Sequence, residues 1–498
     1  MFYESTRGGN KGITSAEVIR MGIAQDGGLF VPSSRKRFTL KEINNLINLN
    51  YLERVYEILK YFLNDFTKDE LIDSIYKAYS NEKFSNSKIA PIKKLNENVS
   101  MLELWHGPTC AFKDMALQIL PHLLVKAGEK INDDSEIVLL VATSGDTGKA
   151  ALEGFKNVKG TRVIVFYPED GVSEIQKYQM ITQEGDNVFT VAVRGNFDDA
   201  QNGVKSLFAN SDLKNVMKKN NMKFSSANSI NWGRLVPQII YYFSSYVDLV
   251  KDGNLELGED LNFVIPTGNF GNILAAFYAR EMGLPINKLI CASNENNVLT
   301  DFINTGVYNK NREFKRTYSP SMDILISSNL ERLLYELNGH NHKEIKGYME
   351  LLNETGTYSI NDELKEKMQS IFWADFSDDS ETVKTIDCIN NEYNYVVDTH
   401  TAVAIDVYDK YVISTGDITK TIIVSTANPF KFSKVVFNSI FKDELRDENE
   451  FDILNKLSDK LGTEIPKGLK DLNNKEILHK DILDKTEMKE YVKKIINI

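Results

Sequence analysis

The first hydrophobic pattern along the chain has the spacing of a helix. Between about Leu40 and Ala78, apolar residues recur at intervals of three and four: Ile43, Leu46, Ile47, Leu52, Val55, Ile58, Leu59, Phe62, Leu63, Leu71, Ile75 and Tyr79. Side chains with this spacing share one face of an α-helix, so the pattern predicts amphipathic helices. We therefore expect residues 1–95 to form a mostly helical N-terminal region.

After Pro91 the pattern changes to short apolar runs that alternate with amphipathic segments. The expected strands are Ile137–Ala142, Arg162–Tyr167, Val188–Val193, Asn262–Ile265, Leu289–Ala292 and Thr421–Ser425. The expected helices between them are Gly148–Phe155, Glu174–Thr182, Asp198–Ala209, Leu235–Val250 and Ile273–Met282. This alternation is typical of parallel sheets covered by helices on both faces, and the fold class is predicted to be α/β.

Charge and composition narrow the range of partners. The 498 residues carry 59 Lys and Arg against 70 Asp and Glu, a net charge of −11, which disfavours binding to nucleic acid. No apolar run approaches the roughly 20 residues that span a membrane. Three cysteines without CxxC spacing predict neither disulfides nor a thiolate zinc site, and the first ten residues lack the apolar run of a secretory signal. We expect a cytoplasmic protein, monomeric or homodimeric, that acts on a small molecule.

Three expected strand ends are rich in small polar residues, at Thr143–Gly148, Thr267–Asn272 and Ser425–Pro429. Ligands of α/β sheets bind where strands end and helices begin. The two glycines of Gly268–Asn272 would direct backbone N–H groups at a phosphate, although an ordinary glycine turn fits equally well. The hydroxyls and amides of Thr143–Gly148 suit a carboxylate or a small phosphate, and a simple N-cap is the alternative.

Lys113 stands in the first turn of an expected helix, where the helix dipole disfavours a cation by roughly 0.3–1 kcal/mol. The adjacent Asp114 could compensate its charge. A neutral amine bound covalently to a carbonyl group would also remove the conflict. An exposed structural lysine is the third interpretation.

Taken together, these segments resemble the threonine synthase family of pyridoxal-phosphate enzymes of fold type II, relatives of the tryptophan synthase β-like enzymes. The similar segments follow in order along most of the chain: Tyr3–Gly8, His106–Thr109, Ala111–Asp114, Thr143–Gly148, Val172–Met180, Asn228–Arg234, Pro266–Asn272, Ala292–Asn294, Asp398–Ala402 and Ser425–Pro429. The resemblance implies two α/β subdomains with parallel-type sheets and a helical N-terminal region. The implied large pyridoxal-phosphate domain comprises 96–143 and 233–440, the smaller mobile domain 144–232, and a helical tail 441–498.

The same resemblance implies a set of residues that bind pyridoxal 5′-phosphate. Lys113 is implied as the Schiff-base lysine and the main catalytic group. The phosphate loop is implied to consist of Gly268, Asn269, Phe270, Gly271 and Asn272. Thr426, with Ser425 as the alternate, would contact the pyridine nitrogen. Asp146 stands where many relatives place an asparagine beside the ring oxygen.

The implied reaction converts O-phospho-L-homoserine and water into L-threonine and phosphate by γ-elimination and β-addition of water, the last step of threonine biosynthesis. The substrate carboxylate is expected at Ser144, Gly145, Thr147 and Gly148. The substrate phosphate is expected at Ser226, Asn228, Asn231 and Arg234, because arginine binds phosphate through two charged hydrogen bonds.

One alternative is kept open and two are disfavoured. A threonine or serine dehydratase of the same fold would share Lys113 and the phosphate loop but would not need a second phosphate site. A nucleotide-binding α/β protein without catalysis conflicts with the absence of the usual glycine fingerprints. A metal hydrolase would use the H-x-H pair of His340 and His342. No third ligand accompanies this pair, so we interpret the two residues as solvated histidines and expect no metal site.

Overall fold

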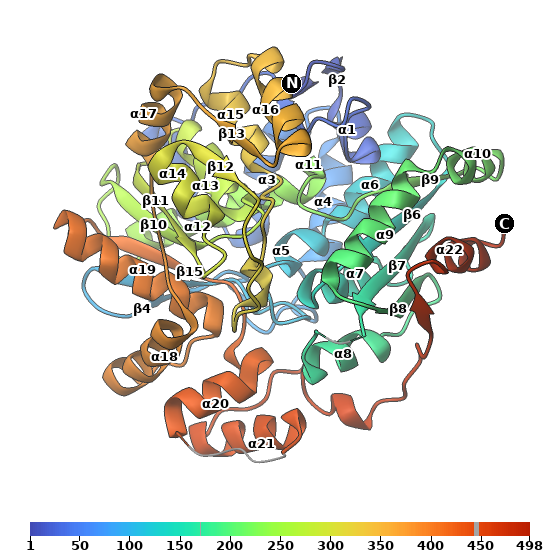
Figure 1. Ribbon diagram of the computed structural model, residues 1–498. Coiled ribbons are helices and arrows are strands. Elements are labelled where there is room, and N and C mark those ends of the chain that lie inside the picture. Colours follow the sequence, from blue (N-terminus) through green and yellow to red (C-terminus); the bar gives the residue numbers. More distant parts are fainter. Residues whose placement is uncertain (170, 443–447) are drawn as a thin grey trace.

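Two mostly parallel β-sheets, each covered by helices, form the body of the protein (Figure 1). The structure is a computed structural model that describes residues 1–169, 171–442 and 448–498. The larger sheet has six strands in the order β14 (Phe372–Phe376), β11 (Ile286–Ser293), β10 (Leu261–Pro266), β15 (Thr421–Ser425), β5 (Val99–Glu103) and β4 (Ile92–Lys94). Neighbouring strands are parallel except β4 and β5.

The smaller sheet has five parallel strands. Their order is β16 (Ile482–Asp484), β8 (Val188–Arg194), β7 (Thr161–Pro168), β6 (Glu136–Ala142) and β9 (Met222–Ser225). The central strands β6 and β7 are rich in Val and Ile and almost completely buried, as expected for a parallel sheet with helices on both faces.

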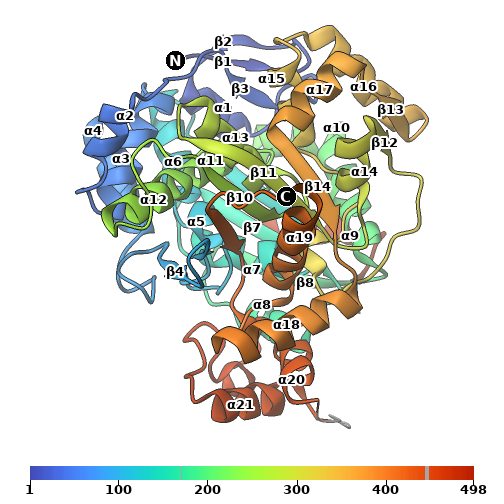
Figure 2. The same cartoon turned by 90° about the vertical axis from the view of Figure 1, so that its left-hand side faces the viewer.

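The helices divide between the two sheets (Figures 1 and 2). Those in the part of the chain that forms the smaller sheet are α7 (Asp146–Phe155), α8 (Glu174–Ile181), α9 (Phe197–Ala209), α10 (Ser211–Lys219) and α22 (Met488–Ile496). The others after the N-terminal region are α5 (Asp114–Leu117), α6 (Leu120–Lys130), α11 (Trp232–Leu235), α12 (Pro237–Lys251), α13 (Gly271–Glu281), α14 (Val298–Thr305), α15 (Leu330–Leu337), α16 (His342–Glu354), α17 (Asp362–Ile371), α18 (Asp379–Tyr393), α19 (Thr399–Thr415), α20 (Ser433–Phe441) and α21 (Glu450–Leu461). Short 3₁₀ turns lie at η1 (Pro320–Met322), η2 (Pro429–Phe432) and η3 (Leu472–Asn474), and a small ribbon pairs β12 (Val307–Asn309) with β13 (Thr357–Ser359). No helix in the described residues is long and apolar enough to cross a membrane.

The N-terminal region contains the helices α2 (Leu40–Asn45), α3 (Tyr51–Phe62) and α4 (Lys68–Ala78), which the apolar spacing predicted, and also α1 (Ser15–Met21), which it did not. Each begins with a capping box, in which the cap side chain and a glutamate three residues later bond each other's backbone N–H groups. A three-stranded antiparallel sheet is formed by β2 (Lys11–Ile13), β1 (Tyr3–Ser5) and β3 (Phe30–Pro32), and α1 lies between β2 and β3 in the chain. The sequence pattern did not predict this sheet.

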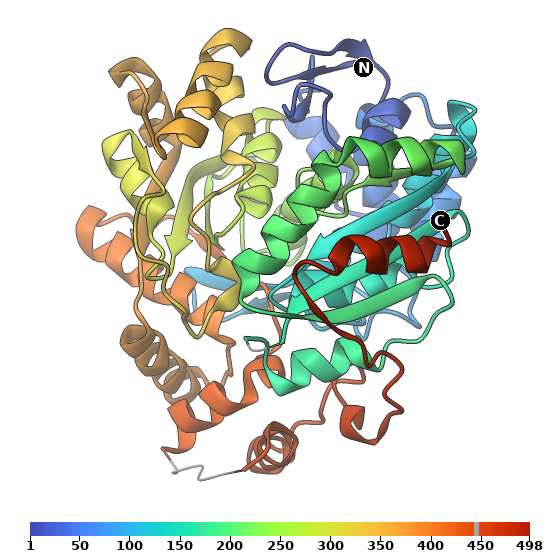
Figure 3. The ribbon, with the colours of Figure 1, turned by 45° about the vertical axis from the view of Figure 1, so that its right-hand side comes forward.

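All six strands expected from the apolar runs are confirmed, but two assignments to domains are wrong. β6 was placed in the large unit 96–143, whereas it hydrogen-bonds to β7 and β9 at the centre of the smaller sheet. The tail 441–498 is also more than a helical segment. It supplies β16 to the smaller sheet, and α22 lies beside α9, where Met488 packs against Gly203 (Figure 3).

His340 is half-buried and paired with two carboxylates, contrary to the interpretation of the H-x-H pair as simply solvated. Its Nδ1 lies 2.7 Å from Oε1 of Glu4, and its Nε2 lies 3.0 Å from Oε2 of Glu336. The hydrogen bond to Glu336 and the charges of both carboxylates raise the pKa of His340. The imidazole therefore ties strand β1 to helix α15 most strongly when it is protonated.

This linkage predicts pH-dependent stability. A raised folded pKa means that the stabilisation is fully present below the unfolded pKa of about 6.5 and is lost as pH rises through the folded pKa. We expect His340→Gln to lower the free energy of unfolding more at pH 6 than at pH 9, measured by urea denaturation, with His342→Gln as the matched control. An equal loss at both pH values would contradict the assignment.

Candidate active site

Lys113 lies at the N-terminus of α5, close to the carboxyl end of strand β5, and its side chain is almost completely buried. Its Nζ donates a hydrogen bond to Oγ of Ser321 at 2.9 Å and lies 3.5 Å from Oδ2 of Asp146. Burial lowers the pKa of Lys113 to about 8, against the opposing charge of Asp146. An amine with this pKa is partly neutral near pH 7, as a nucleophile or general base requires.

Asp114 does not compensate the charge of Lys113 as the sequence allowed. Its Oδ2 accepts the backbone N–H of Thr109 and its Oδ1 accepts the Thr109 hydroxyl, both at 2.8 Å. Burial raises the pKa of Asp114 to about 7. A side chain at Gly107 would collide with this carboxyl group, so glycine is required there. Asp114 therefore fixes the turn that leads into Lys113.

Asp146, the predicted neighbour of the cofactor ring, is the hub of a buried ionic cluster. Its Oδ1 lies 2.7 Å from Nζ of Lys431 and accepts a hydrogen bond from Nε2 of Gln176 at 2.9 Å. Although burial alone would raise it, the charges of Lys431 and Lys113 hold the pKa of Asp146 well below its usual range. The carboxylate is therefore ionised and only accepts hydrogen bonds, unlike the asparagine that the resemblance led us to compare it with.

Lys431 was missed by the sequence analysis. It lies in η2, two residues after the Ser425–Pro429 segment, and is completely buried. Besides Asp146 it donates to the carbonyl oxygen of Thr109 at 3.0 Å. The only sequence signal for Lys431 was its position two residues after the Ser425–Pro429 strand-end segment.

The loop Gly268–Asn272 joins β10 to α13, as expected for a phosphate loop. Phe270 adopts a left-handed conformation with φ of 61°, and the N–H groups of Gly268, Asn269 and Phe270 donate to no protein acceptor in the described part of the chain. The amide Nδ2 of Asn272 is buried and has no partner among residues 1–169, 171–442 and 448–498. Unpaired donors at the start of a helix fit a bound phosphate group.

Thr426 and Ser425, the two candidates for the pyridine nitrogen, differ in their partners. The Ser425 hydroxyl accepts the indole N–H of Trp105 at 3.0 Å and lies 3.2 Å from the hydroxyl of Thr401. The Thr426 side chain is buried, and its hydroxyl makes no hydrogen bond within the described residues. Thr426 therefore has the hydroxyl that is available to a ligand.

The turn between β6 and α7 contains the residues predicted to bind the substrate carboxylate. The hydroxyl of Thr143 accepts the backbone N–H of Gly145 at 3.0 Å and that of Gly148 at 2.9 Å. Those two amides are therefore satisfied inside the protein, and the structure does not support direct binding through them. Ser144 and Thr147 are half-buried and remain the predicted contacts.

Arg234 stands out among the residues predicted to bind the substrate phosphate. It lies in α11, is 6% exposed, and donates one hydrogen bond, from Nη1 to the carbonyl oxygen of Ala227 at 2.7 Å. No acidic side chain in the described part of the chain pairs with it. Burial lowers the pKa of Arg234 to about 10, which leaves it charged at neutral pH. Its remaining N–H groups are free for an anion.

The other three residues of this predicted site differ from Arg234. Asn231 donates both amide protons to backbone carbonyls, of Ile19 and Ser226, and its Oδ1 caps helix α11. The prediction that Asn231 binds phosphate is therefore not supported, since no donor is left. Ser226 is buried and its hydroxyl accepts the backbone N–H of Asn228, whose side chain is exposed.

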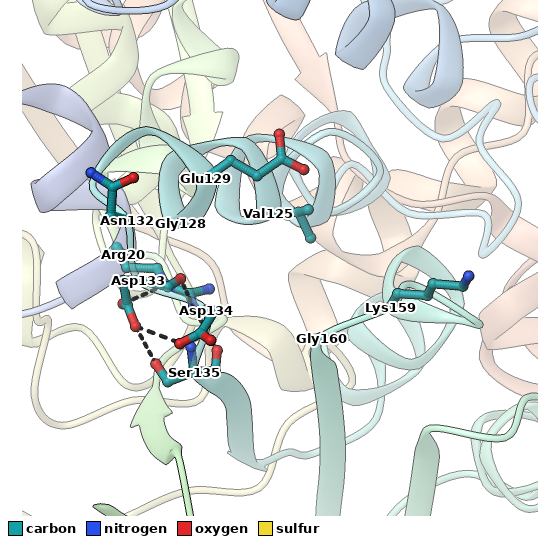
Figure 4. A pocket seen from close by; sticks show the side chains of 10 residues that line it. All are labelled: Arg20, Val125, Gly128, Glu129, Asn132, Asp133, Asp134, Ser135, Lys159 and Gly160. Carbon is teal, nitrogen blue, oxygen red and sulfur yellow. Dashed lines mark hydrogen bonds and ion pairs between the residues drawn. The ribbon is translucent and has the colours of Figure 1, made fainter.

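A surface hollow lies apart from these residues (Figure 4). Its lining consists of Arg20, Val125, Gly128, Glu129, Asn132, Asp133, Asp134, Ser135, Lys159 and Gly160. Arg20 is paired with Asp133 at 2.9 Å and also donates to the carbonyl oxygen of Ser135 at 2.5 Å. Because these central charges neutralise each other, we assign no function to the hollow.

Comparison with known proteins places this geometry in a family. Residues 2–79 match the model "Threonine synthase N terminus", and residues 87–358 match "Pyridoxal-phosphate dependent enzyme". Threonine synthase of Pseudomonas aeruginosa is 36% identical over 88% of this chain and 90% of its own length. Human threonine synthase-like 1 is 41% identical over 87% of this chain. The matched part covers 58% of the length of that relative.

The solved structures agree with the sequence relatives. The crystal structure of threonine synthase from Brucella melitensis with bound pyridoxal phosphate superimposes with a TM-score of 0.87 and 31% identity, over 99% of both chains. The yeast threonine synthase structure gives a TM-score of 0.87 at 30% identity, over 99% of this chain and 98% of its own. Pyridoxal phosphate is thus the cofactor, and the chain belongs to the threonine synthase family of fold type II pyridoxal-phosphate-dependent enzymes.

Proposed function

We propose that this enzyme converts O-phospho-L-homoserine and water into L-threonine and phosphate. The observation that carries the proposal is Arg234, a buried cation that has no carboxylate partner among the described residues. It is close enough to Lys113 that its charge contributes to lowering the pKa of that amine. A substrate with a phosphate group of its own explains why a second anion site exists beside the loop Gly268–Asn272.

The contacts of four parts of the site support a proposal for how the cofactor is held. Lys113 would bind it covalently, Gly268–Asn272 would receive its phosphate, and the free hydroxyl of Thr426 would contact the ring nitrogen. Asp146, ionised and paired with Lys431, would lie beside Lys113. When bound, the cofactor withdraws electrons from the bonds to the substrate carbon that carries the amine.

Lys113 is the base in this proposal. With the cofactor bound, the side-chain amine of Lys113 would remove the proton from the α-carbon of the substrate and would serve the later proton transfers at the β- and γ-carbons. With a pKa of about 8, roughly a tenth of the Lys113 amine is neutral at pH 7, and the ammonium form remains a competent acid. Arg234 holds the phosphate while it leaves and stabilises its charge.

The domain arrangement is proposed on the basis of the two sheets. The larger sheet and its helices form the cofactor-binding unit, and the smaller unit begins with β6 and is completed by the C-terminal β16 and α22. Asp146 comes from the smaller unit, whereas Lys113 and Lys431 come from the larger one. We keep the proposal of a monomer or homodimer that acts on a small molecule.

The experiment that tests the function compares two reactions side by side. Purified enzyme is supplied with O-phospho-L-homoserine and assayed for phosphate and threonine, and in parallel with serine and threonine and assayed for ammonia. We expect equal amounts of phosphate and threonine from the first substrate. Predominant ammonia release from the others would instead support a dehydratase, the alternative with the same fold.

A further inference from the structure

Ser321 contacts the proposed catalytic amine from the 3₁₀ turn η1, which lies outside every segment that the sequence singled out. The Oγ of Ser321 accepts a hydrogen bond from Nζ of Lys113 at 2.9 Å. The same hydroxyl donates to Oδ2 of Asp146 at 3.2 Å. Ser321 therefore connects the lysine to the carboxylate that balances its charge.

The backbone of Ser321 is held in place by His400, a residue of the Asp398–Ala402 segment. Nε2 of His400 accepts the backbone N–H of Ser321 at 3.1 Å, so this nitrogen carries no proton. The ring proton is therefore on Nδ1, which lies 2.8 Å from Oδ1 of the buried Asp398. The carboxylate thus fixes one tautomer of His400, and that tautomer presents an acceptor to Ser321.

Two further contacts restrict the segment that carries Ser321. Asp323 accepts hydrogen bonds from the side-chain amides of Asn294 and Asn296, at 2.7 and 2.9 Å. On the other side, the carbonyl oxygen of Ser321 lies so close to Gly268 that a Cβ there would approach it to 2.8 Å. The segment that carries the Ser321 hydroxyl is thus held by His400, by the contacts of Asp323, and by Gly268 of the predicted phosphate loop.

We propose that Ser321 orients the amine of Lys113 for proton transfer and that His400 is the positioning residue for Ser321. A neutral amine has two N–H bonds and one lone pair. The Ser321 hydroxyl accepts a hydrogen bond from one N–H of the amine and donates its own hydrogen bond to Asp146. The lone pair of the Lys113 nitrogen is then free to point at the substrate carbon. The proton removed from that carbon resides on Nζ and is returned from Nζ, so Ser321 neither gains nor loses a proton.

The inference rests on the proposed role of Lys113, and its test uses the holoenzyme. We expect Ser321→Ala to lower kcat for O-phospho-L-homoserine about tenfold with less than a twofold change in KM, because orientation affects the chemical step. Deuterium at the α-carbon of the substrate should then slow Ser321→Ala more than the parent enzyme. Ser321→Thr, which keeps the hydroxyl, is the matched control.

A second readout needs no turnover. The absorbance of the bound cofactor is titrated with pH in the absence of substrate. An acceptor on the Lys113 nitrogen favours its protonated form, so the midpoint should move to lower pH in Ser321→Ala and stay in Ser321→Thr. The charged groups that affect Lys113, namely Asp146, Lys431 and Arg234, are the same in all these variants. An unchanged midpoint together with an unchanged kcat would overturn the role of Ser321.

A double-mutant cycle tests His400. His400→Phe removes the acceptor, whereas the terminal oxygen of His400→Gln can replace it. We expect a loss of kcat in His400→Phe, partial recovery in His400→Gln, and no further loss when His400→Phe is added to Ser321→Ala. Additive losses would overturn the positioning role. If no variant or parent carries cofactor on Lys113, the proposed function itself has failed, which the parent spectrum reveals separately.

Discussion

Replacing Lys113 with alanine should lower kcat for O-phospho-L-homoserine by at least about 10³-fold, because the same amine binds the cofactor and moves the protons. No nearby side chain in the described part of the protein can take its place. Lys431 is occupied by Asp146 and by the carbonyl oxygen of Thr109, and Asp146 is held ionised by its two lysine neighbours. The loss should also remove the absorbance of covalently attached cofactor.

Steady-state kinetics and the visible spectrum of purified Lys113→Ala provide the measurement. Lys434→Ala, which removes an exposed lysine from helix α20, is the matched control and should retain the turnover of the parent. A Lys113→Ala enzyme that kept a tenth or more of the parent kcat would refute the assignment of the catalytic base.

The second large effect is expected at Arg234. Truncation to alanine removes a buried, charged contact to the substrate phosphate, which is worth about 3 kcal/mol, so KM for O-phospho-L-homoserine should rise about 100-fold. The KM of Arg234→Lys should lie between those of the parent enzyme and Arg234→Ala, because lysine keeps the charge but lacks the planar pair of donors. Initial rates over a wide range of substrate concentration give both constants.

Two observations separate a role in substrate binding from general damage. The spectrum of the bound cofactor in Arg234→Ala should match that of the parent, because the loop Gly268–Asn272 is untouched. Any slow release of ammonia from serine should also be unaffected, since serine has no phosphate. A bleached spectrum, or an unchanged KM, would show that Arg234 does not bind the substrate phosphate.

Local sequence patterns predicted the elements of the body well, because burial on both faces of a parallel strand leaves a run of Val and Ile. They could not tell which sheet a strand joins. The run at β6 is as apolar as that at β10, and only hydrogen bonds to β7 and β9 place it in the smaller sheet. β16 was missed because its three residues lie partly exposed in a charged stretch.

The site residues divide in the same way, into those with a signal in their neighbouring sequence and those that reach the site from far along the chain. Lys113, Arg234 and the glycine loop each carry a local signal, namely an unfavoured charge, a motif or a turn. Ser321 carries none, and Lys431 carries only its place shortly after a strand-end segment. The two residues reach Lys113 and Asp146 from positions 208 and 285 residues further along the chain. Asn231 illustrates the opposite error. Its amide suggested a phosphate ligand, but the backbone around it uses every donor.

The central claim is that Lys113 carries the cofactor, and reduction with borohydride tests it most directly. The purified holoenzyme is reduced and digested, and the peptide that retains the cofactor is identified by mass spectrometry. We predict that the modified residue is Lys113 and that Lys431, which pairs with the same carboxylate, remains unmodified. Cofactor found on Lys431 or on any other lysine, or no attached cofactor at all, would contradict the account.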